Sequence, residues 1–159
     1  MNIISKEEWN NFCDTELSEY DKAIINGKGP TFKPITSPIQ NTLCVCVNDC
    51  LHASSHTDLF VCSDIEFFER VDHSKLKDLK YIAVANKIHR RARPRAGLSY
   101  LNVIELIKDS FSGDVIVYNL AVNPGDHERY KVANPNFITL RTRLSTGNRI
   151  AEHLNEFGL

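Results

Sequence analysis

The sequence has no apolar run that approaches the roughly 20 residues needed for a membrane-spanning helix. Residues 1–11 are polar and acidic, which is unlike a secretory signal peptide. The net charge is only −1, so no field of the whole protein draws the chain toward nucleic acid or a membrane. We therefore expect a cytoplasmic protein without a membrane span.

The number of cysteines is odd. Of the five cysteines, Cys44, Cys46 and Cys62 lie inside apolar stretches that are typical of buried strands. A disulfide framework would need paired cysteines, whereas reduced thiols in the core of a cytosolic protein need no partner. The sequence therefore predicts reduced core thiols.

The composition is that of one globular domain. The 159 residues are 42% hydrophobic and 25% charged, without an internal repeat or a low-complexity tract. We expect a single domain over residues 1–159 with one core.

Short apolar runs alternate with helical patterns along the chain. The runs end in polar loops, and residues 23–26 and 43–47 are typical of central strands. Ser5 and Glu8 have the spacing of a capping box, which predicts a helix over residues 6–20. This alternation predicts a Rossmann-like α/β fold: an open, mostly parallel sheet with helices on both faces. Further strands are expected at residues 59–62, 81–84, 115–120 and 137–140, and further helices at residues 66–71, 97–111 and from 145 onward.

The end of the sequence is unusual for this fold. Gly158 suits the end of a helix, and another strand would be expected next. This leaves open that C-terminal strands are missing. We then expect exposed apolar surface near Ile150, Leu154 and Phe157, covered by a second copy of the chain or by a second chain that completes the sheet.

A glycine-rich loop follows the first expected strand. Gly27-Lys28-Gly29-Pro30-Thr31 would bring backbone N–H groups close to a phosphate, and the threonine would add a hydroxyl. A tight surface turn is the alternative.

The order of motifs resembles the bacterial sialyltransferases and the related motility-accessory-factor glycosyltransferases. The motifs are the loop at residues 27–31, a strand that ends in Val47-Asn48-Asp49, the segment at residues 59–64, and Ser145-Thr146-Gly147 at a helix start. Archaeal hydroxymethylpterin diphosphokinases are similar over the same motifs. The resemblance covers residues 23–159, with two departures: Lys28 replaces the commoner Asn, and the sequence ends before the strand that supplies the catalytic base in sialyltransferases.

The resemblance implies a nucleotide-sugar donor, bound by the loops that follow the strands. Asn48 and Asp49 would reach the ribose, the helix start would meet the phosphate, and Asp64 would stand at the rim of the cleft. The implied nucleotide-binding residues are Gly27, Lys28, Gly29, Pro30, Thr31, Asn48, Asp49, Ser145, Thr146 and Gly147.

Two further residues are candidates for the chemistry. His127 follows an expected strand and has an acid on either side, which suits acid or base work; an ordinary exposed loop histidine is the alternative. Asp64, like Asp49, ends an apolar strand and would hold a sugar hydroxyl, a divalent cation, or simply cap the strand. A divalent metal is allowed but not required.

Cysteines and histidines gather in the middle of the sequence without the spacing of a zinc knuckle. We therefore expect no zinc site there. The residues concerned are Cys44, Cys46, Cys50, His52 and His56.

These observations favour a glycosyltransferase that moves a sugar from a nucleotide donor to an acceptor hydroxyl. A CMP-sugar is favoured over a UDP-sugar, and the acceptor would be a glycan or a modified DNA base. The alternatives are a pyrophosphokinase that acts on a small heterocycle, with Mg²⁺ at Asp49 and Asp64, and a truncated domain that binds a nucleotide or a partner without catalysis.

Residues 87–95 contain five cations and no acid, interrupted by Pro94. Arginine forks in such a segment are suited to phosphate recognition, in the donor or in an anionic acceptor; a solvated loop is the alternative.

Replacement of Arg90, Arg91 and Arg93 by alanine separates these possibilities. If the arginines hold a DNA acceptor, the triple variant should lose DNA affinity, show a flatter salt dependence and keep its nucleotide affinity. If they hold the donor phosphate, nucleotide binding should weaken instead. Titrations with CMP or UDP, and with duplex DNA over a range of salt, measure both. A solvated loop would leave both affinities unchanged.

Overall fold

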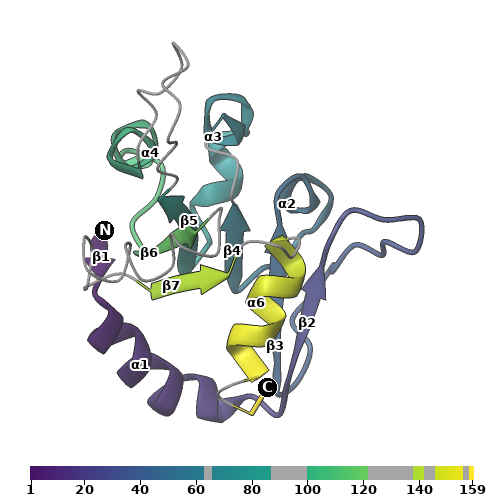
Figure 1. Cartoon of the computed structure of the whole chain (residues 1–159). Helices are drawn as coiled ribbons and strands as arrows, with labels where there is room; N and C mark the ends of the chain where they lie inside the picture. Colours follow the sequence, from purple (N-terminus) through teal and green to yellow (C-terminus); the bar gives the residue numbers. More distant parts are fainter. Residues whose placement is uncertain (63–65, 87–99, 122–137, 142–145, 156–157) are drawn as a thin grey trace.

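The computed structural model describes residues 1–62, 66–86, 100–121, 138–141, 146–155 and 158–159. These residues form the predicted open α/β arrangement around one seven-stranded sheet (Figure 1). Every strand pair is parallel. The strands are β1 (Asn2–Ile4), β2 (Lys22–Asn26), β3 (Thr42–Val47), β4 (Leu59–Cys62), β5 (Tyr81–Asn86), β6 (Asp114–Ala121) and β7 (Ile138–Arg141).

The strands from β2 to β6 lie in sequence order across the sheet, and two short strands share the far edge of β6. β1 pairs with residues 114–116 of β6, at its start. β7 pairs with residues 118–121, farther along the same strand. The two short strands β1 and β7 therefore follow one another along one side of β6. The N-terminal strand β1 was not predicted from the sequence.

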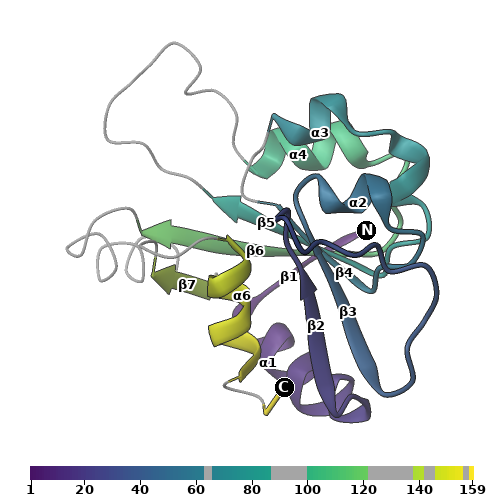
Figure 2. The same cartoon turned by 90° about the vertical axis from the view of Figure 1, so that its right-hand side faces the viewer.

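Helices cover both faces of the sheet (Figure 2). One face carries α2 (Cys50–Ala53), α3 (Phe67–Arg70), η2 (His73–Leu76) and α4 (Tyr100–Ile107), whose buried residues pack on Phe60, Ile82 and Val115. The other face carries α1 (Lys6–Thr15), η1 (Leu17–Glu19) and α6 (Thr146–Asn155), which pack on Val45, Val61 and Ile116. The sheet is thus buried on both sides, as parallel sheets usually are.

Position in the sheet decides how deeply each strand is buried. Every residue of β3 and β4 is buried, which confirms the expected interior strand at residues 43–47. Residues 23–26 were expected to be central as well, and this was wrong: β2 pairs with β3 alone among the described strands and is only half-buried. A short apolar run does not reveal how many neighbours its strand will have.

All five cysteines are free and buried, as expected of reduced core thiols. Burial, reinforced by the charge of Asp14, raises the pKa of the Cys13 thiol to about 12. No helix within the described ranges has both the length and the apolar character needed to cross a membrane.

The capping box at the start of α1 is present. The Ser5 hydroxyl accepts from the Glu8 N–H, and the Glu8 carboxylate accepts from the Ser5 N–H. These hydrogen bonds lower the pKa of Glu8. The helix stops at Thr15, earlier than predicted, and the chain continues as η1.

The last described helix folds back onto the sheet. Ile150 and Leu154 are 4% and 1% exposed, so the expectation of exposed apolar surface at these two residues was wrong. They join the core that also contains residues of α1, because the apolar face of the amphipathic helix α6 turns toward β2 and β4. Phe157 lies outside the described residues.

Gly113 should not tolerate a side chain. A Cβ there would lie 2.2 Å from the carbonyl oxygen of Lys80, which itself accepts from the Asp114 N–H. We expect Gly113→Ala to lower the free energy of unfolding by about 1–3 kcal/mol, the usual cost of overpacking. Urea denaturation followed by circular dichroism measures this. Gly27→Ala, where a Cβ meets nothing within 4 Å, is the matched control and should be nearly neutral.

Trp9 links α1 to α6. Its indole N–H donates to Nε2 of His153, and both side chains are buried. Trp9→Phe keeps an aromatic ring but removes the N–H group that donates to Nε2 of His153. We therefore expect a loss of about 1–3 kcal/mol in the free energy of unfolding. Denaturation monitored at 222 nm by circular dichroism tests it. A variant as stable as the parent would mean that the hydrogen bond does not hold the two helices together.

Candidate functional site

The loops that follow β2 and β3 lie side by side at the carboxyl edge of the sheet. The two strands are parallel neighbours, with Asn26 opposite Cys46. Their C-terminal ends therefore bring residues 27–33 next to Asn48 and Asp49. Open α/β sheets bind ligands at this edge, and here it collects most of the residues predicted to bind the nucleotide.

The first loop is held at both ends. The Gly29 carbonyl accepts from the Phe32 N–H at 3.0 Å, which closes a turn with Pro30 at its second position. The Asn26 side chain donates to the Lys33 carbonyl at 2.8 Å, and the Phe32 ring packs against the core under α2–α4. The loop is therefore a tight, anchored turn, as the alternative interpretation predicted, and this does not conflict with a binding role.

The tip of this turn faces solvent with its donors available. Residues 27–31 are all exposed. The N–H groups of Lys28, Gly29 and Thr31 make no backbone hydrogen bond to another described residue. A Cβ at Gly27 or Gly29 would meet nothing within 4 Å, and neither glycine has a positive φ. The fold therefore does not require glycine at either position, and the space in front of the backbone is open.

Lys28 connects the two loops. Its Nζ lies 3.5 Å from Oδ2 of Asp49, with side chains 80% and 51% exposed. An ion pair this exposed contributes little to stability. The Asp49 side chain makes no capping hydrogen bond at the start of α2, so simple capping does not account for it.

Asn48 forms a rigid corner at the end of β3. Its φ is 51°, in the left-handed region that asparagine tolerates better than most residues. Its N–H donates to the Val61 carbonyl, and its own carbonyl accepts from the Leu51 N–H. The side-chain oxygen Oδ1 is buried and finds no hydrogen-bond partner among the described residues. A hydroxyl or N–H donor would satisfy it.

The helix that begins with Thr146 and Gly147 starts at the same edge. α6 packs against β2, β4 and β7, and both views show it beginning on the side toward which the β2 arrow points and running back along the sheet (Figures 1 and 2). The first turn of α6, whose N–H groups have no partner within the helix itself, therefore lies toward the same side of the molecule as residues 27–31.

The remaining predicted site residues lie outside the described ranges. They follow strands that end at the same edge: β4 ends at Cys62, β5 at Asn86, β6 at Ala121 and β7 at Arg141. The residues concerned are Asp64, Arg90, Arg91, Arg93, His127 and Ser145.

The other edge of the sheet carries a different set of side chains. A cavity of about 290 Å³ lies between β1, α1 and the start of β5 and is lined by Glu8, Glu16, Asp114 and Tyr81, among others. The Tyr81 hydroxyl donates to Glu16, and burial followed by this bond raises the pKa of Tyr81. Three carboxylates make this cavity unsuitable for a phosphate.

The cysteines and histidines of the middle segment do not form one cluster. Cys46 receives a hydrogen bond from Thr57, and His52 packs against the ring of Phe67. Cys44 and His56 do come together, but their third neighbour is Asp58, which the sequence analysis did not include. Their spacing gave no signal, because Cys44 and Asp58 become neighbours only when β3 pairs with β4.

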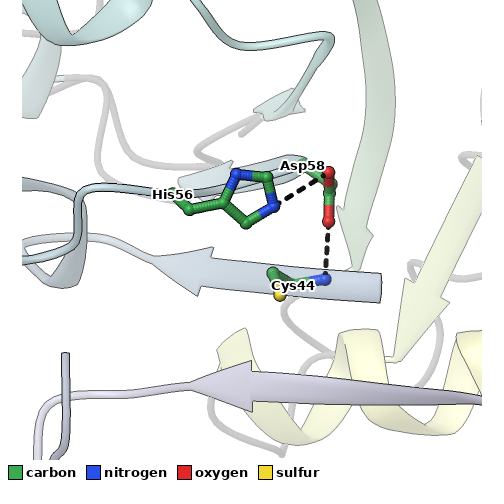
Figure 3. Close-up of side chains that lie close together, drawn as sticks. All are labelled: Cys44, His56 and Asp58. Atoms are coloured by element: carbon green, nitrogen blue, oxygen red, sulfur yellow. Dashed lines mark hydrogen bonds and ion pairs between the residues drawn. The ribbon is translucent and has the colours of Figure 1, made fainter. Parts of the chain in front are cut away.

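Figure 3 shows how these three side chains meet. Asp58 Oδ1 lies 3.3 Å from His56 Nε2, and Asp58 Oδ2 accepts from the Cys44 N–H at 2.9 Å. One possible ligand atom from each residue lies within 4.8 Å of the other two. Burial, and next the Asp58 carboxylate, raise the pKa of the Cys44 thiol. The group has the chemistry of a metal site.

Comparison of the chain with protein-family models, with curated proteins and with solved structures finds no match in any of the three. The resemblance to the sialyltransferases and motility-accessory-factor glycosyltransferases therefore stays a prediction.

Proposed function

We propose that the carboxyl edge of the sheet binds the nucleotide part of a nucleotide-sugar, and that the chain transfers the sugar to an acceptor hydroxyl. A CMP-sugar is the favoured donor, with a UDP-sugar as the second choice. The acceptor is a glycan or a modified DNA base.

The observation that carries this proposal is the meeting of two loops. The exposed turn at residues 27–31 offers N–H groups and the Lys28 ammonium, and Asn48 and Asp49 stand beside it at the end of β3. Backbone N–H groups and one cation suit a phosphate, while the exposed Asp49 carboxylate suits the hydroxyls of a ribose.

The start of α6 supports the same assignment. Its first-turn N–H groups carry the positive end of the helix dipole, and a phosphate between Thr146 and the Gly29 turn would be stabilised from two sides. The arginines of residues 87–95 follow β5 and would add charge to the donor or to an anionic acceptor.

In the transfer step, the bond between the anomeric carbon and the nucleotide phosphate breaks, and the phosphate leaves with the electron pair. Lys28 and the N–H groups stabilise the developing charge on the leaving phosphate. The acceptor oxygen bonds to the anomeric carbon and gives its proton to a base, for which His127 and Asp64 are the candidates. No step requires a divalent cation, although Asp49 would tolerate one.

Two variants of the first loop test the binding site. Gly29→Ala places a methyl group in the open space in front of the turn, and Lys28→Met removes the cation. We expect each to weaken binding of CMP or UDP by about tenfold or more, Gly29→Ala because the methyl group displaces the phosphate and Lys28→Met because a charged phosphate contact is lost. Isothermal titration calorimetry measures the affinity, and thermal melting checks the fold, which should be unchanged because neither residue is packed.

Lys33→Met is the matched control, because Lys33 is an exposed lysine of the same loop that makes no ion pair with Asp49. Its nucleotide affinity should equal that of the parent. Equal affinities in all three variants would remove this loop from the site.

A panel of ligands then separates the kinds of activity. Stabilisation by CMP or UDP in a thermal-shift assay supports a sugar donor, and stabilisation by ATP alone would replace it with pyrophosphoryl transfer. Binding of the intact donor without release of sugar to water or acceptor would make the chain a nucleotide-binding module without catalysis.

A further inference from the structure

The group formed by Cys44, His56 and Asp58 lies away from the proposed nucleotide site. Cys44 is near the start of β3, and Asp58 immediately precedes β4. The loops of the nucleotide site follow the other end of β3, four residues on, or roughly 13 Å along a strand. A role for the three side chains is therefore independent of the nucleotide.

We propose that Cys44, His56 and Asp58 bind a zinc ion, with the fourth position open to water or an added ligand. A thiolate, an imidazole and a carboxylate together are a ligand set that zinc prefers, and three protein ligands are typical of an open zinc site.

The distances suit a tetrahedral ion. Nitrogen and oxygen ligands about 2.0 Å from zinc stand about 3.3 Å apart. His56 Nε2 and Asp58 Oδ1 are 3.3 Å apart already. The three candidate atoms, sulfur included, lie within 4.8 Å of one another. The Cys44 thiol donates to the Thr42 carbonyl at 3.7 Å and would turn from that carbonyl toward the ion.

The surroundings hold the ligands in place. Oδ2 of Asp58 accepts from the Cys44 N–H, which fixes the carboxylate and leaves Oδ1 for the ion. The Asp58 N–H donates to the Cys44 carbonyl, and the His56 N–H donates to the carbonyl of Ile35. These two backbone hydrogen bonds fix the main chain at Asp58 and at His56.

The charges also favour a cation. Asp58 is 7% exposed, and its ion-pair partner among the described residues is His56, which carries a charge only when protonated. The Cys44 side chain is fully buried beside it. The side chain of His56 is 24% exposed, which gives an ion a route in from solvent. As the S–Zn bond forms, the thiol proton leaves to the buffer.

The test begins with the full-length chain. After purification without chelators, mass spectrometry of metals should find about one zinc per chain. The chelator-treated chain should take up Co²⁺ with a thiolate-to-cobalt charge-transfer band and the visible bands of a tetrahedral ion. Less than about a tenth of a zinc per chain after saturation and desalting, or no thiolate band with cobalt, would overturn the proposal.

Matched variants assign the ligands. His56→Ala should weaken zinc affinity at least about tenfold, whereas His52→Ala, which removes a histidine of the same segment, should not. Cys44→Ala should abolish the cobalt band, and Cys46→Ala, on the same strand and equally buried, should keep it. If Cys44→Ala fails to fold, the comparison of His56→Ala with His52→Ala decides. Equal zinc affinity in His56→Ala and His52→Ala would overturn the assignment.

Discussion

The strands of this sheet run in one direction, so each must be followed by a segment that returns the chain to the opposite edge before the next strand begins. Because of this constraint, all strands end at one edge of the sheet, the carboxyl edge, and all strands begin at the opposite edge, the amino edge. Helices cover both faces, and all residues of β3 and β4 are buried. Polar side chains that are able to contact a ligand are therefore concentrated at the two edges.

The two edges differ in charge. The carboxyl edge near β2 offers an ammonium group and free N–H donors, with Asp49 as the acid beside Lys28. The amino edge contains the carboxylates of Glu8, Glu16 and Asp114 around one cavity, and the Asp58 carboxylate beside a thiol. An anionic ligand fits the first edge and a cation fits the second. A nucleotide at one edge and a metal ion at the other would thus occupy the same domain without competing for ligands.

Burial explains most of the cysteines without reference to chemistry. In an interior strand covered on both faces, a cysteine is a small apolar residue that fills space, as Cys46 and Cys62 do in the core beneath α2 and α3. Cys44 has the same burial but a different neighbour, because the register of β3 and β4 sets it opposite Asp58. Whether a buried thiol is a candidate metal ligand therefore depends on the residue opposite it in the neighbouring strand. The sequence of its own strand does not identify that residue.

The sequence by itself determined the class of the fold, because alternating apolar runs and helical stripes allow few arrangements other than a parallel α/β sheet. It also determined the capping box at Ser5 and the placement of residues 27–31 and 48–49 after strands, since these depend on near neighbours along the chain. Only the tertiary structure decided that β2 is an edge strand, that β1 shares an edge with β7, and that Ile150 and Leu154 are covered. It alone brought Lys28 to Asp49 and Asp58 to Cys44. The physical reason is that strand order and register arise from contacts between residues far apart in the chain, which local patterns do not encode.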